Sequence, residues 1–216
     1  MLVFVAVAFL LGECPTTAAP VDDPTHCCMP KQWSGTMGII SGSVSGGKPS
    51  TKNQTIMEYY DYDKMKVALV DVRGTYRIVE DHNKGVSYTI TSNQCTTSKL
   101  TEKLYNCIPT NTTFLGSYTY GGPQGLKVYE YSVDTIVPGL LGRASFSVDN
   151  CLPVVETIIN TGNDPYIDAI GFVNMEMTIK DPSVFDVPSP PCPADTELGN
   201  VVTMPTRRRA IFGRFP

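Results

Sequence analysis

The chain has 216 residues, of which 21 are acidic and 17 are basic, so its formal net charge is −4. Apart from Glu13 and the four arginines that follow Thr206, 13 basic residues stand against 20 acidic ones. This acidic excess argues against nucleic acid as a partner, because binding to phosphates requires a basic surface. Residues 20–205 are enough for a single domain with a hydrophobic core, and residues 206–216 form a basic tail.

The first 11 residues are almost wholly apolar, and small residues follow at positions 17–19. A transmembrane helix needs about 20 apolar residues, so this segment is too short to span a bilayer. It is typical of a signal peptide over residues 1–19, cleaved near Ala19, with a buried strand as the alternative. No later stretch is apolar enough to span a membrane, and the basic tail is unlike a GPI signal. We therefore expect a secreted protein without a transmembrane segment.

The cysteines agree with export. The chain has seven, and removal of the signal peptide would take Cys14 away and leave six: Cys27, Cys28, Cys95, Cys107, Cys151 and Cys192. An even number in an exported chain predicts three disulfides, although six cysteines allow 15 pairings. Cys27 and Cys28 should take separate partners because a bond between neighbours is strained. Two sequons, beginning at Asn53 and Asn111, predict glycosylation in the same compartment.

Two segments alternate clearly between apolar and polar residues, which is typical of half-buried antiparallel strands. In residues 86–91 one face carries Val86, Tyr88 and Ile90. In residues 169–179 one face carries Val173, Met175, Met177 and Ile179. We expect each of these apolar faces to line the interior of the domain.

Other strands are expected, in chain order, at residues 55–62, 65–72, 75–79, 126–133, 144–148 and 154–159. Residues 42–48 are interpreted as a glycine-rich connection, and only residues 98–106 have a helical pattern. Many strands in series, separated by Gly- and Pro-rich turns, predict an all-β meander or barrel.

The sequence lacks the usual signatures of catalysis and of known metal sites. There is no G-x-S-x-G motif, and His26 and His82 are interpreted as surface residues. Residues 42–48 approach a phosphate-binding loop, but Pro49 stands where Ser or Thr is needed. No C-x-x-C pair is present for zinc, and residues 61–63 lack the rest of an EF-hand. We therefore expect no enzyme and no organic cofactor.

Four motifs, in order, give the chain a family resemblance. They are C-M-P-x-x-W-x-G from Cys28, Y-x-x-G-G-P from Tyr118, N-C-x-P-V-x-E-T from Asn150 and K-D-P-S-V-F from Lys180. The sequon at Asn111 also falls where relatives carry one. Together they resemble the ependymin-related proteins, over about residues 27–192, and suggest an invertebrate branch.

The resemblance implies a fold of two stacked, curved antiparallel sheets, or a half-open barrel, around a hydrophobic pocket similar to that of bacterial lipoprotein carriers. It also implies a homodimer, an extracellular or lysosomal location, calcium binding, lipid binding and a part in cell–matrix adhesion. It implies that Cys27 or Cys28 pairs with Cys151 and Cys95 with Cys192, which leaves Cys107 for the remaining N-terminal cysteine. The third cysteine pair of vertebrate relatives has no counterpart in this chain. The arginine-rich tail of this chain matches no segment of those relatives.

We therefore expect a dimeric carrier or adhesion glycoprotein with an apolar cavity. The expected pocket residues are the two alternating faces, with Trp33 and Tyr118 as aromatic residues at the rim: Trp33, Val86, Tyr88, Ile90, Tyr118, Val173, Met175, Met177 and Ile179. Methionine suits such a site because its flexible thioether adapts to irregular ligands. The alternatives are a filled core, and a structural matrix or biomineral component that binds calcium without a lipid ligand.

Overall fold

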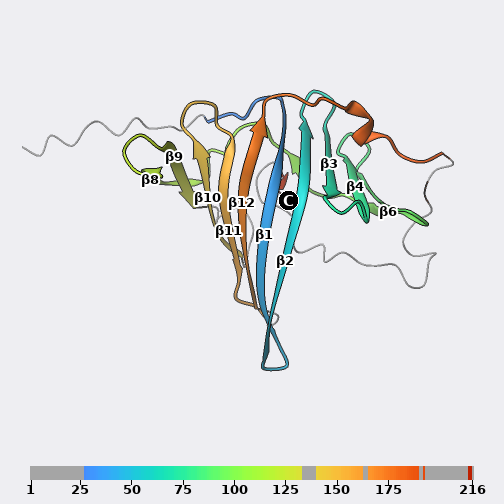
Figure 1. Cartoon of the computed structure of the whole chain (residues 1–216), viewed down its shortest axis with the longest axis horizontal. Coiled ribbons are helices and arrows are strands. Elements are labelled where there is room, and N and C mark those ends of the chain that lie inside the picture. Colours follow the sequence, from blue (N-terminus) through green and yellow to red (C-terminus); the bar gives the residue numbers. More distant parts are fainter. Residues whose placement is uncertain (1–26, 133–139, 163–164, 190–191, 193–213, 216) are drawn as a thin grey trace, which may run out of the picture.

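The computed structural model describes residues 27–132, 140–162, 165–189, 192 and 214–215, and this part of the chain is nearly all β (Figure 1). The expected signal peptide, its cleavage site and most of the basic tail lie outside the described residues. The strands and the single 3-10 turn are β1 (Gln32–Ser45), β2 (Lys48–Asp61), β3 (Lys66–Asp71), β4 (Tyr76–Asp81), β5 (Val86–Thr91), β6 (Cys95–Lys99), β7 (Lys103–Leu104), β8 (Thr113–Tyr120), β9 (Leu126–Ser132), β10 (Leu140–Ser147), β11 (Pro153–Asn160), β12 (Tyr166–Glu176), η1 (Pro182–Phe185) and β13 (Arg214–Phe215).

Eleven strands form one antiparallel sheet in the order β6-β5-β4-β3-β2-β1-β12-β11-β10-β9-β8. The pairing of β1 with β12 joins an N-terminal meander, β1 to β6, to a C-terminal meander, β8 to β12. The edge strands β6 and β8 do not pair with each other, so the sheet is open. The predicted all-β, half-open architecture is confirmed, and its strands belong to one continuous sheet. A separate pair, β7 and β13, places Arg214 opposite Leu104.

The two faces of the sheet differ, because successive side chains of a strand point to opposite sides. The inner face carries Trp33, Met37 and Ile39 of β1, and on it lies the main hydrophobic core. The side chains of Met29, Leu104 and Ile108, from segments outside the large sheet, pack into the same core. The outer face carries the alternate residues of β1, among them Gly38, Ile40 and Gly42.

Part of the outer face is covered by the C-terminal segment. Phe185 of η1 is buried against Ala68 of β3 and Val79 of β4, with Tyr59, Tyr88, Ile90, Ile179 and Val184 packed around them. The Arg77 guanidinium donates hydrogen bonds to the carbonyl oxygens of Ser183 (3.1 Å) and Asp186 (2.7 Å). In Figure 1, η1 (orange) lies at the end of the sheet that holds β3 and β4.

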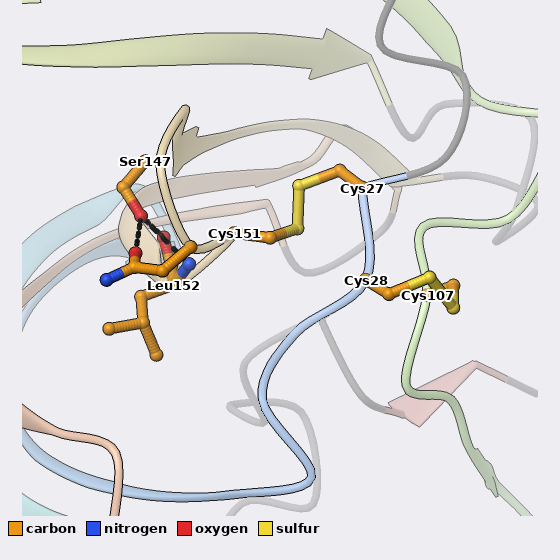
Figure 2. Close-up of a disulfide and its surroundings, with 7 residues drawn as sticks. Cys27, Cys28, Cys107, Ser147, Cys151 and Leu152 are labelled. Atoms are coloured by element: carbon orange, nitrogen blue, oxygen red, sulfur yellow. Dashed lines mark hydrogen bonds between the residues drawn. A yellow bond between two sulfur atoms is a disulfide. The ribbon is translucent and has the colours of Figure 1, made fainter.

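Three disulfides join residues near the two ends of the domain to its middle segments: Cys27–Cys151, Cys28–Cys107 and Cys95–Cys192. This is the pairing that the resemblance implied, and the structure assigns Cys27 to Cys151. Figure 2 shows the first two bonds next to each other, where residues 27–29 meet the segment 106–108. There the Met29 amide donates to the Asn106 carbonyl (2.7 Å), and the Ile108 amide donates to the Cys27 carbonyl (2.9 Å). The first strand is therefore held in place immediately before it begins.

At several elements the sequence pattern predicted the wrong secondary structure or none. The helix predicted at residues 98–106 is absent, because Leu100 and Leu104 are buried and the segment runs extended over the core. β1 and β8 were not predicted, since glycine and serine interrupt their apolar pattern. Residues 42–48 are the end of β1 and its hairpin, where Gly46 and Gly47 take the positive φ values that the turn requires. The alternation expected up to Ile179 ends earlier, because Asn174 has a φ of 54° and β12 stops at Glu176.

Candidate binding face

The middle of the outer face, over β2, β1, β12 and β11, is built around small residues. Gly38 lies opposite Gly171 of β12, and Ile40 lies opposite Ala169 of β12 and Asn53 of β2. Gly42 lies opposite Ile167. A Cβ atom added at Gly38 or Gly171 would meet no atom within 4 Å, so the surface is hollowed there.

Large apolar side chains surround these small residues and are exposed to solvent. The exposed fraction is 65% for Ile40, 53% for Val173, 47% for Leu141, 46% for Ile167 and 45% for Val44. On the outer face of β2, β1, β12 and β11, no charged residue lies level with the part of β1 from Thr36 to Val44. Charge begins at β10, where Arg143 lies opposite Thr157. A contiguous apolar surface with a polar border is typical of a binding site.

Two hollows lie along this face. The first, of about 420 Å³, is formed by residues from all four central strands, including Gly38, Ile40, Asn53, Gln54, Thr55, Val155, Ala169 and Gly171. The second, of about 540 Å³, continues toward the β1–β2 hairpin and includes Gly42, Val44, Pro49, Thr51, Ile159, Pro165 and Ile167. Both volumes fall in the range of about 300–1,000 Å³ typical of small-molecule sites. We call this surface, with its two hollows, the outer apolar face.

The structure spreads the expected pocket residues over several places. Trp33 is 2% exposed in the inner core, where its ring stacks on Tyr60 at 5.4 Å, and Met175 packs against the same core. Tyr88, Ile90 and Ile179 pack around Phe185, and Val86 is half-buried at the start of β5. Met177 is exposed beyond the end of β12, and of the nine residues only Val173 lies on the outer apolar face. Their contact with a ligand stays a prediction.

Tyr118, the second expected rim residue, lies on the edge strand β8. Its hydroxyl is 2.7 Å from that of Ser145 and 3.2 Å from that of Tyr120. Burial, together with the hydrogen bond to Tyr118, raises the pKa of Tyr120 to about 12, so this group is neutral at physiological pH. The cluster is therefore a polar aromatic contact between β8 and β10.

Sequence reasoning missed the residues that form the outer apolar face. The signal was present in β1, where glycine and apolar residues occupy every second position from Gly38 to Val44. On β12 the same face is marked by Ile167, Ala169 and Gly171. These patterns reveal a hollow only when the strands are aligned, since each glycine leaves space only between the larger side chains of neighbouring strands.

Both predicted glycosylation sites are exposed. Asn53 lies on β2 at the first hollow, and Asn111 lies just before β8. Among the described residues, no group of three His, Cys, Asp or Glu side chains could hold a metal ion, so calcium binding stays a prediction. In the same part of the chain, no helix is long and apolar enough to cross a membrane.

Comparison with solved structures supports the fold. An uncharacterized conserved protein from Thermus thermophilus matches 76% of this chain and 90% of its own, with a TM-score of 0.51 and 9% identity. A LolA superfamily protein from Nitrosomonas europaea matches 73% of this chain and 91% of its own, with a TM-score of 0.40 and 8% identity. Only the first score is high enough to indicate a common fold.

Sequence comparison gives the family. The chain is 31% identical over 137 residues to ependymin-related protein 2 of Haliotis asinina, a match over 56% of this chain and 66% of that relative, slightly less than two thirds of its length. It is 28% identical over 184 residues to mammalian ependymin-related protein 1 of Mus musculus, over 80% and 79% of the two chains. The family model described as Ependymin matches residues 71–192, which is more than half of the chain. The chain therefore belongs to the ependymin family.

Proposed function

We propose that this chain is a secreted, non-enzymatic binding protein of ependymin type that holds a hydrophobic ligand of the acyl-chain class on its outer apolar face. The observation that carries the proposal is the pair of adjoining hollows, whose surroundings are apolar, exposed and free of charge. Burial of apolar surface contributes about 25 cal/mol per Å², and a chain-like ligand would cover several exposed side chains at once. Three disulfides, two exposed sequons and the signal-like N-terminus support secretion.

The inner core is a less suitable place for the ligand. Trp33, Tyr60 and Phe146 are at most 2% exposed there, and they pack with other apolar residues in one cluster. A ligand would have to displace close-packed side chains, which is costly. On the outer face, glycine leaves the space open and no side chain has to move.

A homodimer, which the family resemblance implies, is part of the proposal. Sheets that pack face to face lie about 10 Å apart, with side chains filling the space between them, and the missing side chains at Gly38 and Gly171 would leave part of that space open for a ligand. A second copy on the outer apolar face would cover the side of the ligand that one chain leaves exposed. Calcium binding and cell–matrix adhesion are further proposals, supported only by the acidic body and the resemblance.

The test is titration of an environment-sensitive fatty-acid probe into delipidated protein. The wild-type chain is expected to bind the probe and to release it to natural lipids. Gly38→Leu should weaken binding by filling the first hollow, and it adds a side chain where no neighbour lies within 4 Å. Ile40→Glu should weaken binding by placing a charge beside the same hollow, and as a 65% exposed position it should leave the fold intact.

The matched control is Leu115→Glu, which places the same charge at a 43% exposed leucine on the edge strand β8, separated by β9 and β10 from the strands that line the hollows. It should bind the probe like the wild type. A wild-type chain that binds no probe would reject the proposal. If that chain were instead retained on extracellular matrix in a calcium-dependent way, the structural alternative would be favoured.

A further inference from the structure

One of the three disulfides is more accessible to solvent than the other two. Cys28 and Cys107 are both exposed, and they are bonded to each other. Each of the other bonds has a buried partner, Cys151 at 5% exposure or Cys192 at 8%. Thiol–disulfide exchange requires a thiolate to reach a sulfur atom, so exposed disulfides are the labile ones. The Cys28–Cys107 bond is therefore the one that a thiol in solution can attack.

This bond fastens a short segment that lies over the inner core. The segment, residues 104–108, begins at the end of β7 and leads toward β8, and we call it the strap. Leu104 and Ile108 are buried in the main hydrophobic core. Between them, the Tyr105 carbonyl accepts a hydrogen bond from the Tyr60 hydroxyl of β2 (2.7 Å). The strap thus covers part of the inner side of the sheet.

The disulfide is the covalent link where the strap meets residues 27–29. Cys28 and Cys107 lie directly opposite each other in an isolated antiparallel bridge (Figure 2). Two backbone hydrogen bonds, of 2.7 and 2.9 Å, flank the bond. Such hydrogen bonds contribute less to stability than a disulfide does. Reduction should therefore loosen the strap, while the Cys27–Cys151 bond still holds the beginning of β1.

The strap is connected to the only tryptophan of the chain. Trp33 is 2% exposed and stacks on Tyr60, whose hydroxyl bonds to the strap. Its Nε1 atom is buried and has no hydrogen-bond partner within the described structure. Water that enters when the strap loosens could accept a hydrogen bond from this group, which lowers the cost of opening. Trp33 therefore reports whether the strap is closed.

We infer that Cys28–Cys107 is a thiol–disulfide exchange site for a low-molecular-weight thiol, and that its reduction loosens the strap and opens the inner core to solvent. The inference goes beyond the proposed function and does not depend on the outer apolar face, which lies on the other side of the sheet. Reoxidation of the two cysteines closes the strap again, so the state of the inner core follows the thiol content of the surroundings.

The exchange takes place in two steps. In the first, the thiolate of the small molecule attacks one sulfur atom and forms a mixed disulfide, and the other sulfur leaves as a thiolate. In the second, another small-molecule thiolate attacks the mixed disulfide, releases the second cysteine and forms a small-molecule disulfide. Two external thiols supply the two electrons, and the protons that they lose on ionisation pass to Cys28 and Cys107.

The first test compares the three bonds in the folded, full-length protein. Oxidised protein is incubated with reduced glutathione without denaturant, free thiols are trapped with N-ethylmaleimide, and peptide mass mapping locates them. Cys28 and Cys107 should become labelled at least about tenfold faster than the cysteines of the other two bonds. Reduction of all three bonds at one rate, or of Cys95–Cys192 first, would overturn the inference.

The second test measures the strap through the fluorescence of Trp33. Quenching by acrylamide should rise at least about twofold when Cys28–Cys107 is reduced, and it should fall again on reoxidation, because the strap opens and closes locally. The double variant Cys28→Ser, Cys107→Ser should show the higher quenching without any thiol. The reduced wild-type chain gives the same reading without a substitution.

The matched control removes a different disulfide. Cys95→Ser combined with Cys192→Ser should leave the quenching of Trp33 at the level of the oxidised wild type, since this bond lies on the edge strand β6. Selective reduction of Cys28–Cys107 without a change in Trp33 quenching would overturn the inference. An equal rise in quenching in both double variants would overturn it as well.

Discussion

At the scale of single residues, the buried carboxylate of Asp71 shows how a turn stabilises the sheet. Asp71 ends β3, and its Oδ2 accepts hydrogen bonds from the Thr75 hydroxyl (2.5 Å) and the Thr75 amide (3.4 Å). The Thr75 side chain chiefly holds the pKa of Asp71 below its usual value, with the Thr75 amide and Arg73 adding to this and burial opposing it. Ionised Asp71 thus stabilises the turn between β3 and β4.

Because the pKa of Asp71 is lower in the folded state than in the unfolded chain, its stabilising contribution is present above about pH 4 and is lost as the pH falls further. Thr75→Val should lower the free energy of unfolding by about 1–3 kcal/mol at pH 7. The difference from the wild type should shrink below pH 4, where Asp71 becomes protonated in both proteins. Urea unfolding between pH 7 and pH 2 measures it.

Thr91→Val is the matched control. The Thr91 hydroxyl bonds only to the backbone of Gln94 in a comparable exposed turn, without a carboxylate. Any cost of this substitution should be the same at both ends of the pH range. A difference between Thr75→Val and the wild type that did not change with pH would contradict the assignment to Asp71.

At the scale of elements, η1 determines which part of the outer face stays exposed. Asp181 accepts a hydrogen bond from the Ser183 amide (2.9 Å) at the start of the turn, and Pro182 follows, so the segment is shaped locally. Phe185 is then inserted onto Ala68 and Val79, and Arg77 holds the backbone on either side. The outer surface of β3 and β4 is covered in this way, whereas that of β1 and β12 is not.

Phe185→Ala should lower the free energy of unfolding by about 3–5 kcal/mol, because it leaves a cavity above Ala68 and Val79. Val187→Ala changes a neighbouring residue that is 38% exposed, and it should cost less than about 0.5 kcal/mol. Urea unfolding of the two variants is the measurement. Similar values for both would mean that η1 does not hold the sheet.

At the scale of the whole molecule, the disulfides restrain two different regions of the domain. Cys27–Cys151 and Cys28–Cys107 hold the beginning of β1 to the segments after β7 and β10 (Figure 2). Cys95–Cys192 holds the end of the C-terminal segment to the first residue of the edge strand β6. An edge strand has unpaired backbone groups and benefits from such a cover.

Replacing Cys95 and Cys192 together by serine should lower the free energy of unfolding by about 2–5 kcal/mol. Amide hydrogen exchange should become faster in β5, β6 and η1, and it should stay slow in β1 and β11, which the other two bonds restrain. The double replacement of Cys28 and Cys107 should reverse this pattern and affect the beginning of β1. Equal acceleration throughout the sheet in both variants would show that the bonds do not act on separate regions.

The sequence by itself determined the all-β class, the number of disulfides and the family, because strand period, cysteine parity and short motifs are local properties of the chain. The tertiary structure decided the rest. Residues 98–106 have a helical pattern, but the segment runs extended over the core because Leu100 and Leu104 are buried. Cys27 and Cys28 are equivalent in sequence, and only the pairing of residues 27–29 with 106–108 separates their partners. The outer apolar face arises because the register sets Gly38 beside Gly171 and Ile40 beside Asn53, and register is a relation between distant strands that no single segment carries.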